Sequence, residues 1–303
     1  MIIVATTCVG RDRELAELDR RCAATATRGA DVVAVVGEPG IGKSALLRRL
    51  TDEHPGARWA RAAVWEADTP GAVLSQLLQE QVPAEPVAAA RHFVDRITAP
   101  TLVVVDDAEH TDDASLHALA TAVRHHRDVG LLVVLGMTDR QARVADLISD
   151  EIRLEGLDAA AVAELAASRG RVLHPAKADV LTRHTGGNPR HILALLDEVP
   201  AAVWSRPDTQ LPAPSHVVAE VDARMQRCSA QGQALVAALA ILGETASLGE
   251  AAELAGLDEP LSAIDETVAA GLVTRWADDD PRLPDALTKA AVLSLMGAHN
   301  ARD

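Results

Sequence analysis

The residues with the clearest capacity for chemistry lie between Gly37 and Ser44, where the chain reads Gly-Glu-Pro-Gly-Ile-Gly-Lys-Ser. This spacing, G-x-x-x-x-G-K-[ST], is typical of a loop whose backbone N–H groups surround phosphate. Glycines let the backbone approach the anion without a Cβ clash. We expect Lys43 to reach the β- and γ-phosphates and the Ser44 hydroxyl to bind Mg²⁺. The expected nucleotide contacts are Gly37, Glu38, Pro39, Gly40, Ile41, Gly42, Lys43, Ser44 and Ala45.

A second candidate group follows the apolar run Leu102–Val105, which ends in Asp106 and Asp107. Sheets of parallel strands bind ligands at the carboxyl ends of their strands, so we expect these acids to lie beside the glycine-rich loop. Asp106 is expected to hold Mg²⁺ largely through water, because this ion keeps much of its hydration shell. Asp107 is expected to orient or deprotonate an attacking water. The alternative is an Asp pair that caps the next helix.

Arg140 is a third candidate, just beyond the apolar run Leu131–Leu135. At the same edge of the sheet, its guanidinium would stabilise charge that develops on the γ-phosphate. The alternative is a solvated surface arginine.

The elements that must position these residues are short apolar runs separated by helical patterns. Five runs are typical of buried strands: Val32–Val36, Ala62–Trp65, Leu102–Val105, Leu131–Leu135 and Arg153–Leu157. Helical spacing occurs between them at Ser44–Leu50, Val73–Gln81, Val87–Ile97 and Asp113–His126. This alternation predicts an α/β fold with a five-stranded parallel sheet and helices on both faces.

Beyond Leu157 the pattern is mostly helical. A small set of helices is followed by a stretch that holds four prolines, Pro200, Pro207, Pro212 and Pro214, which is typical of a linker. The last block has three or four helices and a short β-like run, Leu272–Arg275, in an order typical of a winged helix. We therefore predict a P-loop nucleotide-binding domain (1–157), a small helical domain (158–199), a linker (200–215) and a winged-helix-like domain (216–303).

Composition excludes several classes of function. The chain of 303 residues has 29 basic and 44 acidic side chains, a net charge of −15, which disfavours binding of a phosphate backbone. The segment 216–303 alone has six Lys/Arg and 14 Asp/Glu, a net charge of −8, unlike a basic DNA-reading face. No apolar run approaches the ~20 residues that span a bilayer, and the start does not read as a secretion signal. Three widely spaced cysteines, Cys8, Cys22 and Cys228, favour a reducing cytoplasm.

Neither a guanine-reading N-K-x-D motif nor the Leu-Ser-Gly-Gly-Gln signature of transporter ATPases occurs in the sequence, so adenine is the favoured base. The ordered motifs resemble those of STAND-class P-loop ATPases, and within that class the large ATP-binding regulators of the LuxR type. The resemblance rests on the segments Val9–Glu14, Gly37–Ser44, Val105–Asp112 and Thr185–Pro189, and on the pattern Leu235–Leu242 with Gly271–Val273.

The resemblance implies a slow, Mg²⁺-dependent ATPase that acts as a switch, closed with ADP and self-associating with ATP. It implies that Val9, Gly10 and Arg11 approach the nucleotide from the N-terminal segment and that Pro189 packs on adenine. In the family, DNA is bound by a C-terminal helix-turn-helix, which these 303 residues do not include. Nucleotide is thus the expected ligand, with no membrane partner.

The sequence departs from the family pattern at three places. Glu109-His110 replaces the common His-Trp, so Glu109 adds a third carboxylate and competes with Asp107 for the role of catalytic base. Asp12 replaces a glutamate, and Arg190 stands where an apolar residue is common. Two other functions stay open at this point: an ATP-dependent small-molecule kinase or transferase, and a DNA-binding winged-helix protein.

Overall fold

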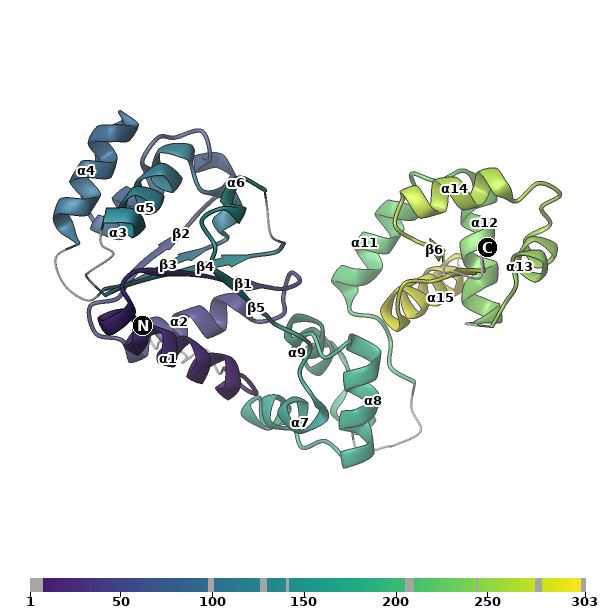
Figure 1. Cartoon of the computed structure of the whole chain (residues 1–303). Helices are drawn as coiled ribbons and strands as arrows, with labels where there is room; N and C mark the ends of the chain where they lie inside the picture. The colour runs from purple at the N-terminus through teal and green to yellow at the C-terminus, as the bar shows by residue number, and fades with distance from the viewer. Residues whose placement is uncertain are drawn as a thin grey trace. The chain divides into compact units, whose positions relative to one another are not determined.

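The computed structural model describes residues 8–97, 101–125, 130–139, 142–204, 210–243, 245–275 and 280–300. The chain divides into two compact units, Met1–Gly156 and Leu157–Asp303, which are described one at a time (Figure 1). The finer division into four segments stays a prediction.

The first unit is built on one sheet, whose five strands in the described residues are all parallel and lie in the order β2-β3-β4-β1-β5. Their bounds are β1 Asp31–Val36, β2 Arg58–Arg61, β3 Thr101–Asp106, β4 Leu131–Met137 and β5 Asp150–Arg153. The predicted five-stranded parallel sheet is thereby confirmed. Strand β4 lies between β1, which leads into the glycine-rich loop, and β3, which leads into the acids.

Helices cover both faces of this sheet (Figure 1). Alternate residues of a strand point to opposite faces, and β1 therefore contributes to two cores. Val33 and Val35 pack with α1 and α2, while Val32 and Val36 pack with α3, α4 and α5. The helices are α1 Asp12–Arg28, α2 Lys43–Glu53, α3 Ala72–Leu78, α4 Pro86–Arg96, α5 Asp113–His125 and α6 Ala142–Ala145, with 3-10 turns η1 Val64–Glu66 and η2 Ala108–His110.

Two of the predicted strands are misplaced. The run Ala62–Trp65 is not a strand: β2 occupies Arg58–Arg61, and Trp65 is 83% exposed on the turn η1. The last strand of the sheet is Asp150–Arg153, so the predicted Arg153–Leu157 shares one residue with it. The observed strands β2 and β5 lie at the two edges of the sheet and contain charged residues. Their apolar content is too low for the pattern that identifies buried strands.

The second unit is mostly helical. Its helices are α7 Ala159–Ser168, α8 Pro175–Thr185, α9 Pro189–Glu198, α10 Ala201–Trp204, α11 Ser215–Met225, α12 Ala230–Leu242, α13 Leu248–Ala255, α14 Leu261–Ala269 and α15 Ala286–Asn300. Two short antiparallel strands, β6 Thr274–Arg275 and β7 Pro281–Arg282, precede α15. The buried helix α12 packs against α13, α14 and α15. The winged-helix assignment of this segment stays a prediction.

In the part of the chain that the structure describes, no helix combines the length and the apolar character that crossing a bilayer requires.

Candidate nucleotide-binding site

The glycine-rich loop joins β1 to α2 and depends on two glycines with positive φ. Gly40 has φ 84° and Gly42 has φ 105°, values that strain any residue with a Cβ. Helix α2 begins at Lys43, and its N-terminus receives no capping hydrogen bond from a described side chain. Free N–H groups and the positive end of the helix dipole therefore face the loop, as an anion requires.

Lys43 is the buried cation of the site, with 7% of its surface exposed. Its Nζ donates hydrogen bonds to the carbonyl oxygens of Gly37, at 2.6 Å, and Glu38, at 3.1 Å. Burial lowers the pKa of Lys43, and the negative charges of Glu109, Asp106 and Asp107 oppose that shift. The loop thus holds an ammonium group within the field of the acids that follow β3.

Asp106 is the most deeply buried of these acids, with 1% exposed. Its Oδ1 accepts a hydrogen bond from Asp107 N at 3.2 Å, while Oδ2 is buried with no hydrogen-bond partner among the described residues. Burial raises the pKa of the Asp106 carboxyl, and the nearby Ser44 side chain opposes the rise. The structure therefore brings together the two residues that the sequence suggests as metal ligands.

Gly136, on β4, makes room for this arrangement. A Cβ at Gly136 would lie 2.5 Å from Leu47 Cδ1 and 3.1 Å from Asp106 Oδ1. The first of these distances is shorter than any that real Cβ atoms normally show. Gly136 carries no signal in the sequence, because the neighbours that crowd it, Leu47 and Asp106, are distant along the chain.

Asp107 lies next to Arg61, another residue of the site that no sequence pattern indicates. Arg61 ends β2, pairs in register with Asp106, and donates from Nε to Asp107 Oδ2 at 2.7 Å. Asp107 itself has φ 52°, a left-handed conformation that is uncommon outside glycine and that begins the turn η2. Asp107 thus faces the outer strand β2.

Glu109 is bound to the other neighbouring strand. Its Oε1 accepts hydrogen bonds from Thr138 N, at 3.1 Å, and from Thr138 Oγ1, at 2.8 Å. Thr138 follows the last residue of β4. Glu109 Oε2 is buried and has no hydrogen-bond partner in the described parts of the chain. Thr138 is a third residue of the site, after Gly136 and Arg61, that no sequence pattern indicates.

Arg11 is buried against the loop. Its guanidinium donates to Ile41 O at 3.0 Å and to Glu155 O at 2.6 Å, and it pairs with Glu14 at 3.2 Å. Val9 is buried, and Gly10 is exposed with φ 67°. Arg11 therefore ties the N-terminal segment to the loop, and its contact with nucleotide stays a prediction.

Two of the predicted contacts are not part of this cluster. Arg140 lies outside the described residues. Pro189 belongs to the second unit, where it is the first residue of α9 and follows Asn188, whose side chain accepts from Arg190 N. Its packing on adenine stays a prediction.

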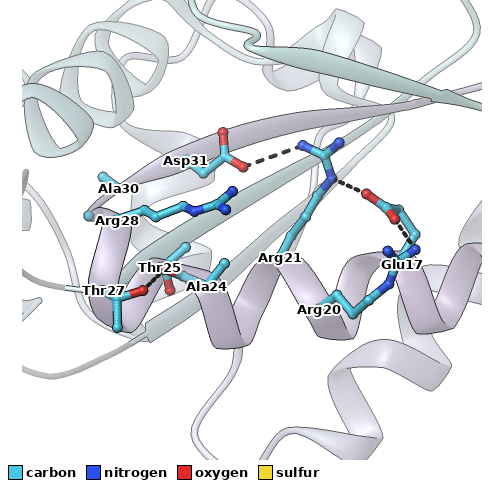
Figure 2. Close-up of a pocket in the computed structure, with 10 residues that line it drawn as sticks. Glu17, Arg20, Arg21, Ala24, Thr25, Thr27, Arg28, Ala30 and Asp31 are labelled. Carbon is cyan, nitrogen blue, oxygen red and sulfur yellow. Dashed lines mark hydrogen bonds and ion pairs between the residues drawn. The ribbon is translucent and has the colours of Figure 1, made fainter.

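A separate pocket of about 640 Å³ lies where α1 ends and β1 begins (Figure 2). Arg21 donates to Glu17 at 2.7 Å and to Asp31 at 3.5 Å, so the charges of the pocket are largely paired. Because β1 starts at Asp31 and reaches the glycine-rich loop only after Val36, this pocket lies at the opposite edge of the sheet from the candidate site.

Comparison with protein families identifies an AAA ATPase domain in residues 7–134. The matched segment includes the glycine-rich loop and the acids after β3, and it ends within β4. The comparison with curated proteins gave no match.

Three solved structures are among those to which the chain is similar. A RuvB variant of Thermotoga maritima is 13% identical, with a TM-score of 0.48, over 91% of this chain and 92% of that chain. A Walker-type ATPase of Pyrococcus abyssi is 11% identical, with a TM-score of 0.49, over 93% and 95%. A STAND protein with a tetratricopeptide repeat sensor, from Pyrococcus horikoshii, is 16% identical, with a TM-score of 0.42, over 95% and 43%.

The matched residues and the parallel sheet lie together in the first unit, which thus carries an AAA ATPase domain on a P-loop α/β fold. Proteins with this kind of domain usually bind nucleotide.

Proposed function

We propose that this chain is an ATP-binding, slowly ATP-hydrolysing switch, the ATPase part of a STAND-class regulator of the LuxR type. The observation that carries the proposal is the meeting of the loop residue Ser44 with Asp106, whose buried Oδ2 has no partner among the described residues. The regulator type rests on the resemblance of the ordered motifs from Val9 to Gly271. We place the protein in the cytoplasm, with self-association in the ATP state.

The residues at this edge fit a magnesium ion together with a nucleotide. No group of three or more His, Cys, Asp or Glu side chains able to hold a metal by themselves is found in the described residues. Magnesium is usually bound by one or two protein oxygens plus phosphates and water, so Ser44 and Asp106 would suffice. When bound, the ion neutralises charge on the β- and γ-phosphates. Lys43 and the N-terminus of α2 would bind the same phosphates.

Replacing Asp106 by asparagine tests the metal assignment. The amide keeps an acceptor for Asp107 N but lacks the negative charge that attracts a cation. We expect Mg²⁺ to tighten ATP binding to the parent by about tenfold, or about 1.4 kcal/mol, and to have little effect on Asp106→Asn. Calorimetric titration of each protein with ATP, once in the presence of Mg²⁺ and once in the presence of EDTA, measures the effect of Mg²⁺ on ATP affinity in the parent and in the variant. An equal magnesium effect in the variant would remove Asp106 from the metal site.

The switch is tested at Pro189. Proline fixes φ and has no N–H that needs a partner, so it presents a rigid apolar ring. If this ring packs on adenine and closes the protein around ADP, then Pro189→Ala should speed ADP release by roughly tenfold, since it removes two apolar methylenes. ATP can favour opening only through different affinities for the two states.

The rate is measured by displacement of a fluorescent ADP analogue, with light scattering of both nucleotide states beside it. An unchanged release rate, together with an unchanged size with ADP and ATP, would contradict the switch.

The proposal as a whole is tested by the nucleotide that co-purifies with the protein, followed by titration with ATP, ADP and GTP. We expect bound ADP or ATP, preference for adenine, and slow release of phosphate. Absence of any nucleotide binding would overturn the proposal. Tight binding of duplex DNA by this chain at physiological salt would instead favour a DNA-binding role.

A further inference from the structure

The carboxylates of Asp107 and Glu109 bind partners on opposite sides of strand β3. Strand β3 has β2 on one side and β4 on the other. Asp107 pairs with Arg61 at the end of β2, on the side away from β1. Glu109 accepts from Thr138, just beyond β4, on the side toward β1 and its glycine-rich loop. Of the two, Glu109 is therefore the carboxylate that lies toward the phosphate site.

The hydrogen bonds of the two groups also differ. Asp107 Oδ2 accepts a charge-assisted hydrogen bond at 2.7 Å from Arg61, and this class of bond is strong. Glu109 is held through Oε1 alone, by two donors on one residue, while Oε2 is buried without a partner among the described residues. A general base needs an oxygen that no other donor occupies, and Glu109 Oε2 meets this requirement among the described residues.

We infer that Glu109, and not Asp107, accepts the proton of the attacking water; this rests on the proposed ATPase function. The water oxygen forms a bond to the γ-phosphorus as the bond from that phosphorus to the bridging oxygen breaks. The electron pair of the broken bond stays on ADP. The water proton passes to Glu109 Oε2 and then to solvent, leaving inorganic phosphate. Thr138 positions Glu109, and Arg61 holds Asp107 outside the reaction.

The test compares three acid-to-amide substitutions in the full chain: Glu109→Gln, Asp107→Asn and Asp113→Asn. Asp113 is the matched control, because it lies on the same segment and its carboxyl is 95% exposed. Steady-state phosphate release gives kcat, and titration with Mg·ATP gives Kd. We expect Glu109→Gln to lower kcat by roughly 10²- to 10⁴-fold, the usual contribution of a general base, with Kd unchanged. Asp107→Asn should lower kcat by much less, and Asp113→Asn should match the parent.

The split between kcat and Kd separates catalysis from nucleotide binding: loss of a general base lowers kcat and leaves Kd unchanged. A larger loss of kcat in Asp107→Asn than in Glu109→Gln would overturn the inference, as would parental turnover in Glu109→Gln. The Kd measurement on the parent tests the proposed function by itself. A parent chain that binds no ATP would overturn that function, whatever the three variants do.

Thr138→Val is a second variant should Glu109→Gln fail to fold. It removes one of the two donors to Glu109 and leaves the backbone N–H in place. We expect kcat to fall by about three- to tenfold at unchanged Kd, in line with the loss of one hydrogen bond. Unchanged kcat in this variant would contradict the positioning role of Thr138 and with it the assignment of Glu109.

Discussion

Replacing Asp112 by alanine should lower the free energy of unfolding of the first unit by about 3–5 kcal/mol, because three backbone N–H groups lose their acceptor and each costs about 1–3 kcal/mol when left unpaired. Asp112 is 2% exposed. It accepts from Gly71 N at 2.7 Å, Val73 N at 3.3 Å and Ser115 N at 2.9 Å, and from Ser115 Oγ at 2.7 Å. The carboxylate thereby binds the start of α3 to the start of α5.

The measurement is urea unfolding followed by circular dichroism, with Asp113→Ala as the control. Asp113 is the next residue, and its carboxyl lies in solvent beside Arg143. The control should change stability by no more than about 0.5 kcal/mol, as is usual for surface substitutions. If the two variants lose equal stability, Asp112 does not have the structural role described above.

Replacing Lys43 by alanine should weaken ATP binding roughly 10- to 100-fold, since each hydrogen bond to a charged group contributes about 1.5–3 kcal/mol. Lys43 donates to Gly37 O and Glu38 O, so its ammonium group is held at the loop. Phosphate oxygens would replace these carbonyls at little cost in side-chain entropy.

Calorimetric titration with ATP gives the two affinities, and unfolding curves establish that the variant is folded. Arg124→Ala is a suitable control, because it removes one positive charge from an exposed position at the end of α5. The control should bind ATP as the parent does. Equal affinity in the Lys43→Ala variant would mean that the loop does not bind phosphate.

The parts of the site that could be predicted are those that local sequence determines. The spacing from Gly37 to Ser44 requires no partner elsewhere in the chain, and the apolar run before Asp106 is that of a strand buried on both faces. The predicted sheet followed from these signals. The edge strand β2 was missed because Arg58 and Arg61 interrupt its apolar pattern, while the more apolar run Ala62–Trp65 lies in a turn.

The residues that sequence could not reveal act through contacts with other strands. Arg61 reaches Asp107 across 46 positions, and Thr138 reaches Glu109 across 29. Gly136 matters only because Leu47 and Asp106 approach it in the folded chain. Helix α1 was also missed, because few apolar side chains, chiefly Leu15 and Leu18, mark its buried face. Such pairings depend on strand order, which local patterns do not encode.

The position of β4 between β1 and β3 fixes the distance between the glycine-rich loop, which follows β1, and the acids, which follow β3. Neighbouring strands lie about 4.8 Å apart, so the end of β1 and the end of β3 are separated by about 10 Å. Side chains from the loop and from the end of β3 must therefore bridge the width of one strand in order to meet, as Ser44 and Asp106 do. The strand that they cross carries Gly136 at this level, where a Cβ would lie 3.1 Å from Asp106 Oδ1. The absence of a side chain on the middle strand is thus what lets residues of two non-adjacent strands share one site.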